Sequence, residues 1–106
     1  YRTYLNTTPN DPNARVDLGI CYFELGKLDT TRSGSLFSMA INEMESAMKT
    51  SPTHQPGAFN LGIVYLYAGN LKESNKWFKK AIELNPESDL GKRAKDILDQ
   101  HAQAGL

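Results

Sequence analysis

Few residues of this chain could carry chemistry, and they lie far apart. His54, His101 and Cys21 are of the types that most often bind metals or attack substrates. Neither histidine has a ligand-type residue four positions away, so the spacing does not match a helical metal motif. We interpret His54 as a loop residue beside Pro52, His101 as part of a C-terminal helix, and Cys21 as a small buried apolar residue, with a reactive thiol as the alternative. We therefore expect no catalytic residues, no metal site and no cofactor, and predict that the protein is not an enzyme.

A group of basic residues around Trp77 could indicate nucleic-acid binding. The group consists of Lys72, Lys76, Lys79 and Lys80, and is followed by Lys92, Arg93 and Lys95. Acidic residues such as Glu73 and Glu83 interleave with it, and the whole chain has 12 basic and 12 acidic residues. We therefore favour an ordinary solvated helix face and predict no nucleic-acid partner.

Length and composition predict one compact, soluble domain. The 106 residues are 40% hydrophobic and 23% charged, which is typical of folded proteins. The longest nearly apolar run, residues 61–69, is about half of a bilayer span, so we expect no direct membrane insertion. A cytoplasmic location is the default. An anchored or exported parent protein stays open, because the chain starts at Tyr1 instead of Met.

An internal repeat in the sequence predicts the secondary-structure elements that carry these residues. Residues 18–22 read LGICY, and residues 61–65, at an offset of 43, read LGIVY. A Gly-x-Leu segment follows each of them at the same distance, at 26–28 and at 69–71. Self-similarity of this kind is the signature of a repeat architecture.

Prolines mark the register of the repeat. Pro52 and Pro86 are 34 residues apart, whereas Pro9 and Pro52 are 43 apart. The first unit therefore contains a nine-residue insertion, which we place near residues 30–39.

The insertion begins with polar turn-forming residues and ends with mostly apolar ones. This order predicts a short loop followed by a longer second helix, capped near Ser33 or Ser35. The alternative is a protruding apolar lip, made by Leu36, Phe37 and Met39, that touches a partner.

The pattern L-G-x-x-Y, then A-x-x-x-F and a proline, on a 34-residue period, resembles the tetratricopeptide repeat (TPR) family of helix-turn-helix units. The matching residues are Leu61, Gly62, Tyr65, Ser74, Phe78, Ala81 and Pro86 in one unit, and Leu18, Gly19, Tyr22, Ala40, Met44, Ala47 and Pro52 in the other. Ser74 departs from the usual alanine. The resemblance implies an all-α, right-handed helix-turn-helix solenoid of two TPR units plus a C-terminal capping helix.

Apolar residues spaced three and four apart predict the helices independently of this resemblance. We expect helices over residues 12–26, 35–50, 55–68, 71–84 and 88–102, without any sheet. Asp11 is the expected N-cap of the first, and Gly26 and Gly69 are expected to end the first and third. We divide the chain into a remnant of a preceding helix (1–8), a first TPR unit (10–54), a second TPR unit (55–88), and a capping helix with its tail (89–106).

The resemblance also implies that the first helices of the units line a concave groove. The expected groove residues are Asn13, Val16, Asp17, Ile20, Phe23, Glu24, Phe59, Asn60, Ile63, Leu66 and Tyr67. Large apolar side chains dominate this set, and soluble proteins seldom expose such a patch without a function. Chaperone-binding relatives hold a terminal carboxylate here with Lys and Asn, but Val16 and Ile20 stand at matching places, so we expect no such clamp despite Asn60. The terminal helix covering this surface is the alternative.

These observations favour a non-enzymatic protein-protein interaction scaffold that binds a peptide segment or a partner helix on its concave face. A self-assembling structural TPR module, and so a homo-oligomer, is one alternative. The other is a TPR accessory subunit of a membrane-bound complex such as cytochrome c maturation, whose TPR proteins have similar Tyr-Leu-x-x-x-Pro-x-Asp segments before the first repeat.

Overall fold

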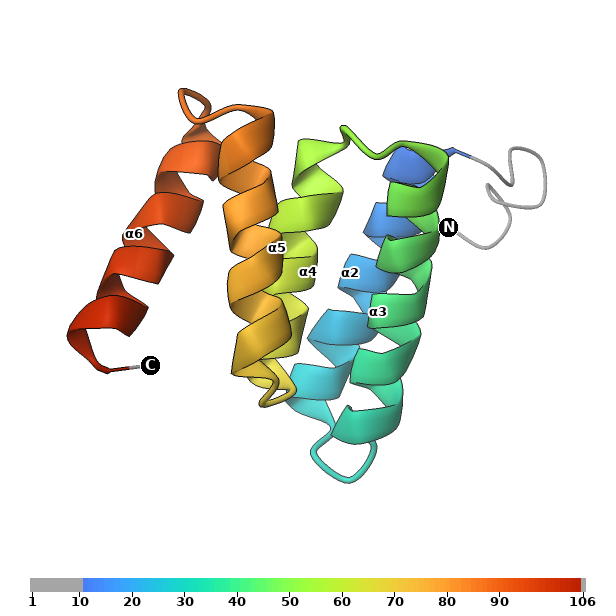
Figure 1. Ribbon diagram of the computed structural model, residues 1–106. Helices are drawn as coiled ribbons and strands as arrows, with labels where there is room; N and C mark the ends of the chain where they lie inside the picture. Colours follow the sequence, from blue (N-terminus) through green and yellow to red (C-terminus); the bar gives the residue numbers. More distant parts are fainter. Residues whose placement is uncertain (1–10, 106) are drawn as a thin grey trace.

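The computed structural model describes residues 11–105, which form helices and short turns without any strand (Figure 1). The helices are α2 (Pro12–Leu28), α3 (Ser33–Thr50), α4 (Gln55–Tyr67), α5 (Leu71–Leu84) and α6 (Asp89–Gln103). All five predicted helices are confirmed, with ends that differ by a few residues. The predicted helix remnant at 1–8 lies outside the described residues.

Two of the three helix ends predicted from the sequence are confirmed. The Asp11 carboxylate accepts hydrogen bonds from the backbone N–H groups of Asn13 and Ala14, so it is the N-cap of α2 as predicted. Gly69 has a φ of 85° just after α4, a conformation that side chains other than glycine rarely adopt.

Gly26 does not end the first helix, contrary to our prediction. Helix α2 continues through it to Leu28. The reason for the glycine is close packing, because a Cβ on Gly26 would lie 2.7 Å from Cε1 of Phe37. The small residue lets α2 approach the beginning of α3.

The insertion forms a short turn followed by a longer second helix, as predicted, and the first helix is longer as well. Helices α2 and α3 have 17 and 18 residues, against 13 and 14 in α4 and α5, and their turn extends beyond the α4–α5 turn in Figure 1. The predicted serine cap is wrong, since α3 begins at Ser33 and no side chain caps it. Asp29 orders the turn instead, because its carboxylate accepts hydrogen bonds from Thr31 and, at 2.8 Å, from Nε of Arg32. These bonds lower the pKa of Asp29 to about 2.

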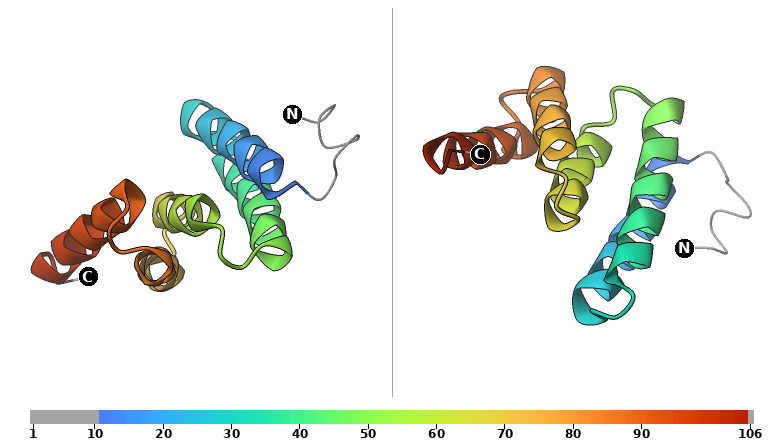
Figure 2. Two further views of the ribbon diagram at one scale, coloured as in Figure 1. Left: turned by 90° about the horizontal axis from the view of Figure 1, so that it is seen from above. Right: turned by 60° about the horizontal axis from the view of Figure 1, so that its bottom comes forward.

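The helices form two layers. Helices α2, α4 and α6 lie in one layer, and α3 and α5 lie in the other (Figure 2). Helix α4 contacts both α2 and α6, and it also packs against α3 and α5. The first helices of the pairs therefore make a continuous wall, and this arrangement confirms the predicted all-α solenoid.

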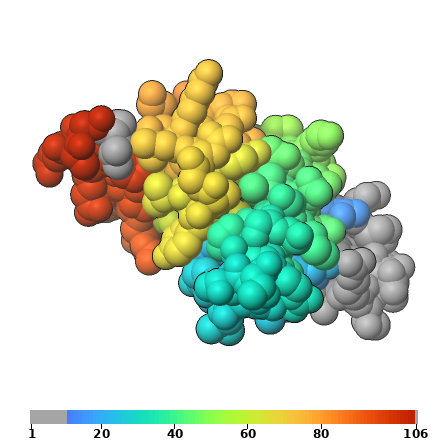
Figure 3. Space-filling model, turned by 90° about the horizontal axis from the view of Figure 1, so that it is seen from below, coloured from blue at the N-terminus to red at the C-terminus, as the bar shows by residue number. Residues whose placement is uncertain are grey.

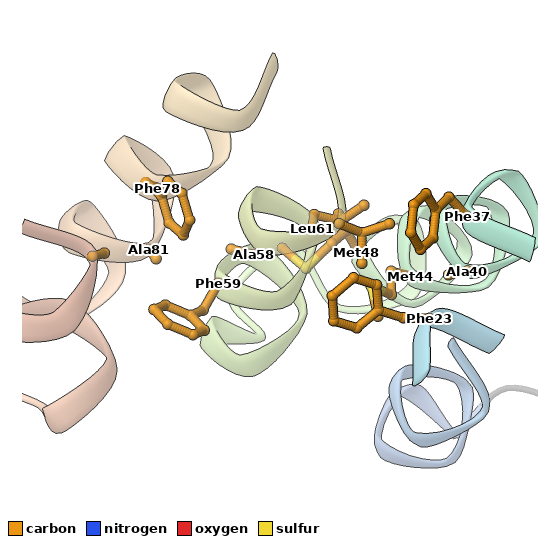
Figure 4. Packing of buried hydrophobic residues seen from close by; sticks show 12 residues of the cluster. Phe23, Phe37, Ala40, Met44, Met48, Ala58, Phe59, Leu61, Phe78 and Ala81 are labelled. Carbon is orange, nitrogen blue, oxygen red and sulfur yellow. The ribbon is translucent and has the colours of Figure 1, made fainter. Parts of the chain in front are cut away.

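The repeated glycine and its partners form the core of each pair. A Cβ on Gly62 would lie 2.6 Å from the Phe78 ring, and one on Gly19 would lie 2.9 Å from Met44. Phe78 and Met44 are completely buried, and Figure 4 shows both among the core residues. Ser74 is also buried, and its hydroxyl donates a 2.7 Å hydrogen bond to the Gly62 carbonyl. This bond explains why serine can replace the usual alanine.

Candidate partner-binding face

The eleven residues predicted for the groove all lie on α2 and α4. They differ in solvent exposure, and therefore in how accessible they are to a partner. Asn13, Asp17, Glu24 and Tyr67 are exposed, Ile20, Asn60, Ile63 and Leu66 are half-buried, and Val16, Phe23 and Phe59 are buried. We call the accessible eight the α2–α4 face.

Val16 belongs to the contact between the wall helices. Its Cγ2 atom lies 3.5 Å from the position that a Cβ of Gly57 would occupy, so it fills the space between α2 and the first turn of α4. Its burial positions the face but leaves little of the side chain for a partner.

Phe59 is buried, contrary to the expectation that it is exposed in the groove. Its ring packs on Phe78 with centroids 5.6 Å apart, and the Arg93 guanidinium of α6 lies 5.8 Å from the ring centroid. The terminal helix therefore covers the wall at this position, because a side chain from α6 closes over the phenyl ring. On α4, the accessible part of the predicted apolar line begins at the half-buried Ile63.

An aromatic cluster forms one end of the face, where α2, α3 and α4 meet. The buried Phe23 ring lies 5.6 Å from Phe37 and 5.0 Å from Tyr67, edge to face in the second case. The Lys27 ammonium lies 4.8 Å from the Phe23 centroid and 3.2 Å from the Glu24 carboxylate. Tyr67 remains 56% exposed, so the cluster presents one side of a fixed ring to solvent.

Two members of this cluster, Lys27 and Phe37, are missing from the residues predicted for the site. The spacing of four between Phe23 and Lys27 was a usable signal, because such residues are neighbours on a helix. Phe37 had no signal, since it belongs to the insertion and has no counterpart in the second repeat. Phe37 and Leu36 are buried, so the alternative of a protruding lip is wrong for both.

Beside this cluster the surface is hollowed. The hollow has a volume of about 310 Å³ and is lined by Ser33, Gly34, Phe37, Ser38, Ile41, Tyr67 and Ala68. Figure 3 shows this end of the molecule, with the α2–α3 turn beside the end of α4. Tyr67 and Phe37 therefore line this hollow, while Phe23 stays buried.

The Asn60 amide of the face donates a 2.8 Å hydrogen bond to the Pro56 carbonyl within α4, so this amide is already engaged.

Within residues 11–105 no three His, Cys, Asp or Glu side chains gather as a metal site would require. None of the described helices is long and apolar enough to span a membrane.

The two histidines and the cysteine occupy unrelated places. His54 precedes α4 in a loop, as predicted, and burial of its ring lowers its pKa, opposed by the carboxylates of Asp11 and Asp17. His101 lies in the last turn of α6, as predicted, where its Nδ1 is 2.8 Å from Oδ1 of Asn75. Cys21 is half-exposed instead of buried, which corrects our expectation.

The basic group on α5 lies on the opposite layer from the α2–α4 face. Lys72, Lys76 and Lys79 line an open hollow of about 470 Å³ together with Asn75 and Glu83. Lys76 also lies 3.7 Å from the Glu73 carboxylate. Acidic and basic groups therefore alternate on this helix, as they do on many solvated surfaces.

Comparison with known proteins places the chain in a family of repeats. Residues 56–88, which span α5 and all of α4 except its first residue, match the family model described as tetratricopeptide repeat. Heat shock protein STI1 of Saccharomyces cerevisiae is 35% identical over 80 residues, which cover 76% of this chain. The chain spans only 12% of the length of that relative. Together the two findings support a general role in protein interaction, without catalysis.

Proposed function

Because the chain belongs to the tetratricopeptide repeat family, we propose that it is a non-enzymatic scaffold that binds a peptide segment or partner helix along the α2–α4 face. The observation that carries this proposal is that Ile20, Ile63 and Tyr67 all keep accessible surface on the neighbouring helices α2 and α4. The two isoleucines are half-buried, and Tyr67 is the most exposed of the three.

Ile20 and Ile63 occupy equivalent positions of the two repeats. Each is only half-buried on its wall helix, so both supply apolar area to a partner. Two such positions on adjacent helices suit a ligand with apolar side chains at regular spacing, such as an amphipathic helix or an extended peptide.

Tyr67 is the expected anchor of the site. Its ring is held against Phe23 and Phe37, with centroids 5.0 and 6.4 Å away, so little side-chain entropy is lost when a partner covers it. Binding energy at protein interfaces concentrates in such aromatic residues, at about 2 kcal/mol or more for a strong anchor.

The charges of the face indicate a partner of mixed character. Asp17 and Glu24 are exposed on α2, and Lys27 pairs with Glu24 near the aromatic cluster. A purely acidic or purely basic partner gains little from this arrangement. A terminal carboxylate is also a poor ligand, because Ile20 takes the place of a donor and Asn60 is bonded within its own helix.

The test is selection of ligands from a displayed peptide library, followed by measurement of affinity on variants. We expect Ile63→Ser together with Tyr67→Ala to weaken the selected peptides by about 100-fold, the effect of truncating one strong and one moderate contact. Phe59 is left unchanged in this test because its ring is buried beneath α6.

The matched control places two substitutions, Lys72→Ser and Lys79→Ser, on exposed positions of α5. These changes should leave affinity unchanged, and all variants should keep their helical circular dichroism and melting temperature. Equal loss of binding on both variants, or none on the first, would refute the assignment of the site to the α2–α4 face.

A further inference from the structure

A second hollowed surface lies in the layer of α3 and α5, on both sides of Trp77. The chain has one tryptophan, and it is half-buried in α5. A hollow of about 290 Å³ lies between its ring and α3, and one of about 300 Å³ lies along α5. The first is lined by Glu45, Met48, Lys49 and Trp77, and the second by Lys76, Trp77, Lys80 and Glu83. We call the two hollows together the Trp77 groove.

The part of the Trp77 side chain that a partner can reach is hydrocarbon. The indole Nε1 atom is buried, and no residue within 11–105 accepts a hydrogen bond from it. Because this polar atom is turned inward, the accessible part of the half-buried ring consists of carbon atoms. Met48 adds a second apolar side chain to the first hollow. The groove therefore suits an apolar side chain of a ligand.

Lysines surround this apolar centre. Lys72, Lys76 and Lys80 follow one another at steps of four along α5, so they share one side of the helix. Lys79 lines an adjoining hollow with the first two, and Lys49 lies across the groove on α3. Like charges at a spacing of four destabilise a helix, so a negatively charged ligand would relieve a repulsion that the free chain contains.

The acidic residues nearby leave most of this positive charge unpaired. Among the described residues, Lys76 is the only one of these lysines that pairs with a carboxylate, at 3.7 Å from Glu73. The Glu45 carboxylate accepts a 2.9 Å hydrogen bond from the Tyr65 hydroxyl, so it is already engaged. The whole chain has no net charge, and the lysines around Trp77 are therefore a local excess.

The placement of the acidic side chains favours a peptide over a nucleic acid. Glu45 and Glu83 each line one hollow beside the tryptophan. A nucleic acid carries a negative charge at every phosphate and would meet these carboxylates, whereas a peptide can place its own carboxylates at the lysines and an apolar residue at the ring. Lysine also lacks the planar fork with which arginine binds phosphate.

We propose that the Trp77 groove binds an acidic peptide segment in which an apolar side chain stands between carboxylates. The apolar side chain packs on the Trp77 ring, and the carboxylates pair with Lys49 on one side and Lys80 on the other. The α2–α4 face lies in the other layer and exposes Asp17 and Glu24, so it does not compete for such a ligand (Figure 2). Two different segments can therefore be bound at once.

The experiment uses the full chain and an end-blocked peptide made of glutamate and leucine. Anisotropy of the fluorescently labelled peptide measures its affinity. With the unlabelled peptide, the emission of the single tryptophan reports whether the ligand covers the ring. We expect saturable binding with a dissociation constant below about 1 mM, and a shift of the Trp77 emission over the same range of concentration. Two control peptides, one with serine for every leucine and one with lysine for every glutamate, should bind at least about tenfold more weakly.

Two double variants of the full chain locate the binding. Lys49→Ser with Lys80→Ser should weaken the acidic peptide about tenfold, the effect of removing two charge pairs at an accessible surface. The matched control, Lys92→Ser with Lys95→Ser, removes the same charge from exposed positions of α6 and should leave the affinity unchanged. None of the four lysines is buried, so both variants should fold, which circular dichroism checks.

Three results would overturn the inference. The first is an absence of binding up to about 1 mM peptide. The second is equal binding of the serine control peptide, or an equal loss in the two double variants, since either would make the attraction a general effect of charge. The third is tighter binding of a single-stranded oligouridylate that Lys49→Ser with Lys80→Ser weakens, which would make a nucleic acid the occupant. None of these results depends on whether the α2–α4 face binds its own partner.

Discussion

Replacing Gly62 by alanine should destabilise the protein, although alanine is the better helix former. The gain in helix propensity from this change is about 1 kcal/mol. The new Cβ, however, would lie 2.6 Å from both Cδ1 and Cε1 of the Phe78 ring, well inside van der Waals contact. The two effects have opposite signs, so their sizes decide the outcome.

The ring cannot easily move out of the way. Phe78 is completely buried and lies between Phe59, with centroids 5.6 Å apart, and His101, at 6.5 Å. Overpacking of a well-filled core costs about 1 to 3 kcal/mol, and a rigid ring places Gly62→Ala near the upper end. We therefore expect a net loss of about 2 kcal/mol in the free energy of unfolding after the propensity gain.

Urea unfolding followed by circular dichroism measures this loss as a fall of about 1 M in the midpoint, for a typical slope of ~2 kcal/mol per M. Gly34→Ala is the control, because no atom lies within 4 Å of its added Cβ, and it should be neutral or mildly stabilising. In a Phe78→Leu background the clash is relieved, so adding Gly62→Ala should become neutral or stabilising. A Gly62→Ala protein as stable as the parent would refute the explanation that contact with the Phe78 ring requires glycine at this position.

Two further predictions concern the same helix pairs. Phe78→Ala should cost about 3 to 5 kcal/mol in urea unfolding, because it empties a fully buried ring site, and a loss under about 1 kcal/mol would contradict the register of the repeat. Burial, reinforced by the hydrogen bond that Tyr65 donates to Glu45, raises the pKa of Tyr65 to about 12, so the fold favours the neutral phenol. Its contribution to stability should persist below the ordinary pKa of 10 and decline as pH rises toward 12, and Tyr65→Phe should lose less stability over that window.

The helices were predictable because local rules and the repeat agree on them. Apolar spacing, the Asp11 cap and the Gly69 turn all have causes within a few residues of chain, and the structure contains each of them. Gly26 was misread because one residue type serves two purposes, a left-handed turn or close packing. The choice between them depends on Phe37, which is distant in sequence and comes close to Gly26 only when the two helices pack together.

Which helix faces are used was predictable, but which residues on them stay accessible was not. The repeat implies that Ile20, Ile63 and Tyr67 share one side of the wall with Val16 and Phe59. Their exposure depends on neighbouring helices, since α4 buries Val16 and the Arg93 side chain of α6 closes over Phe59. Such burial is set by tertiary packing, which periodicity within a helix does not contain.

The insertion shapes the aromatic end of the α2–α4 face. Because it lengthens the α2–α3 hairpin beyond the α4–α5 turn, it brings Phe37 to within 6.4 Å of Tyr67 and so fixes the ring that anchors the α2–α4 face. The same extension carries Leu28 and Met39 past the neighbouring helices, where they are left exposed at the outer end. A repeat of ordinary length would have neither feature. The added residues therefore hold the Tyr67 ring in place on one side of the hairpin and leave Leu28 and Met39 exposed at its end.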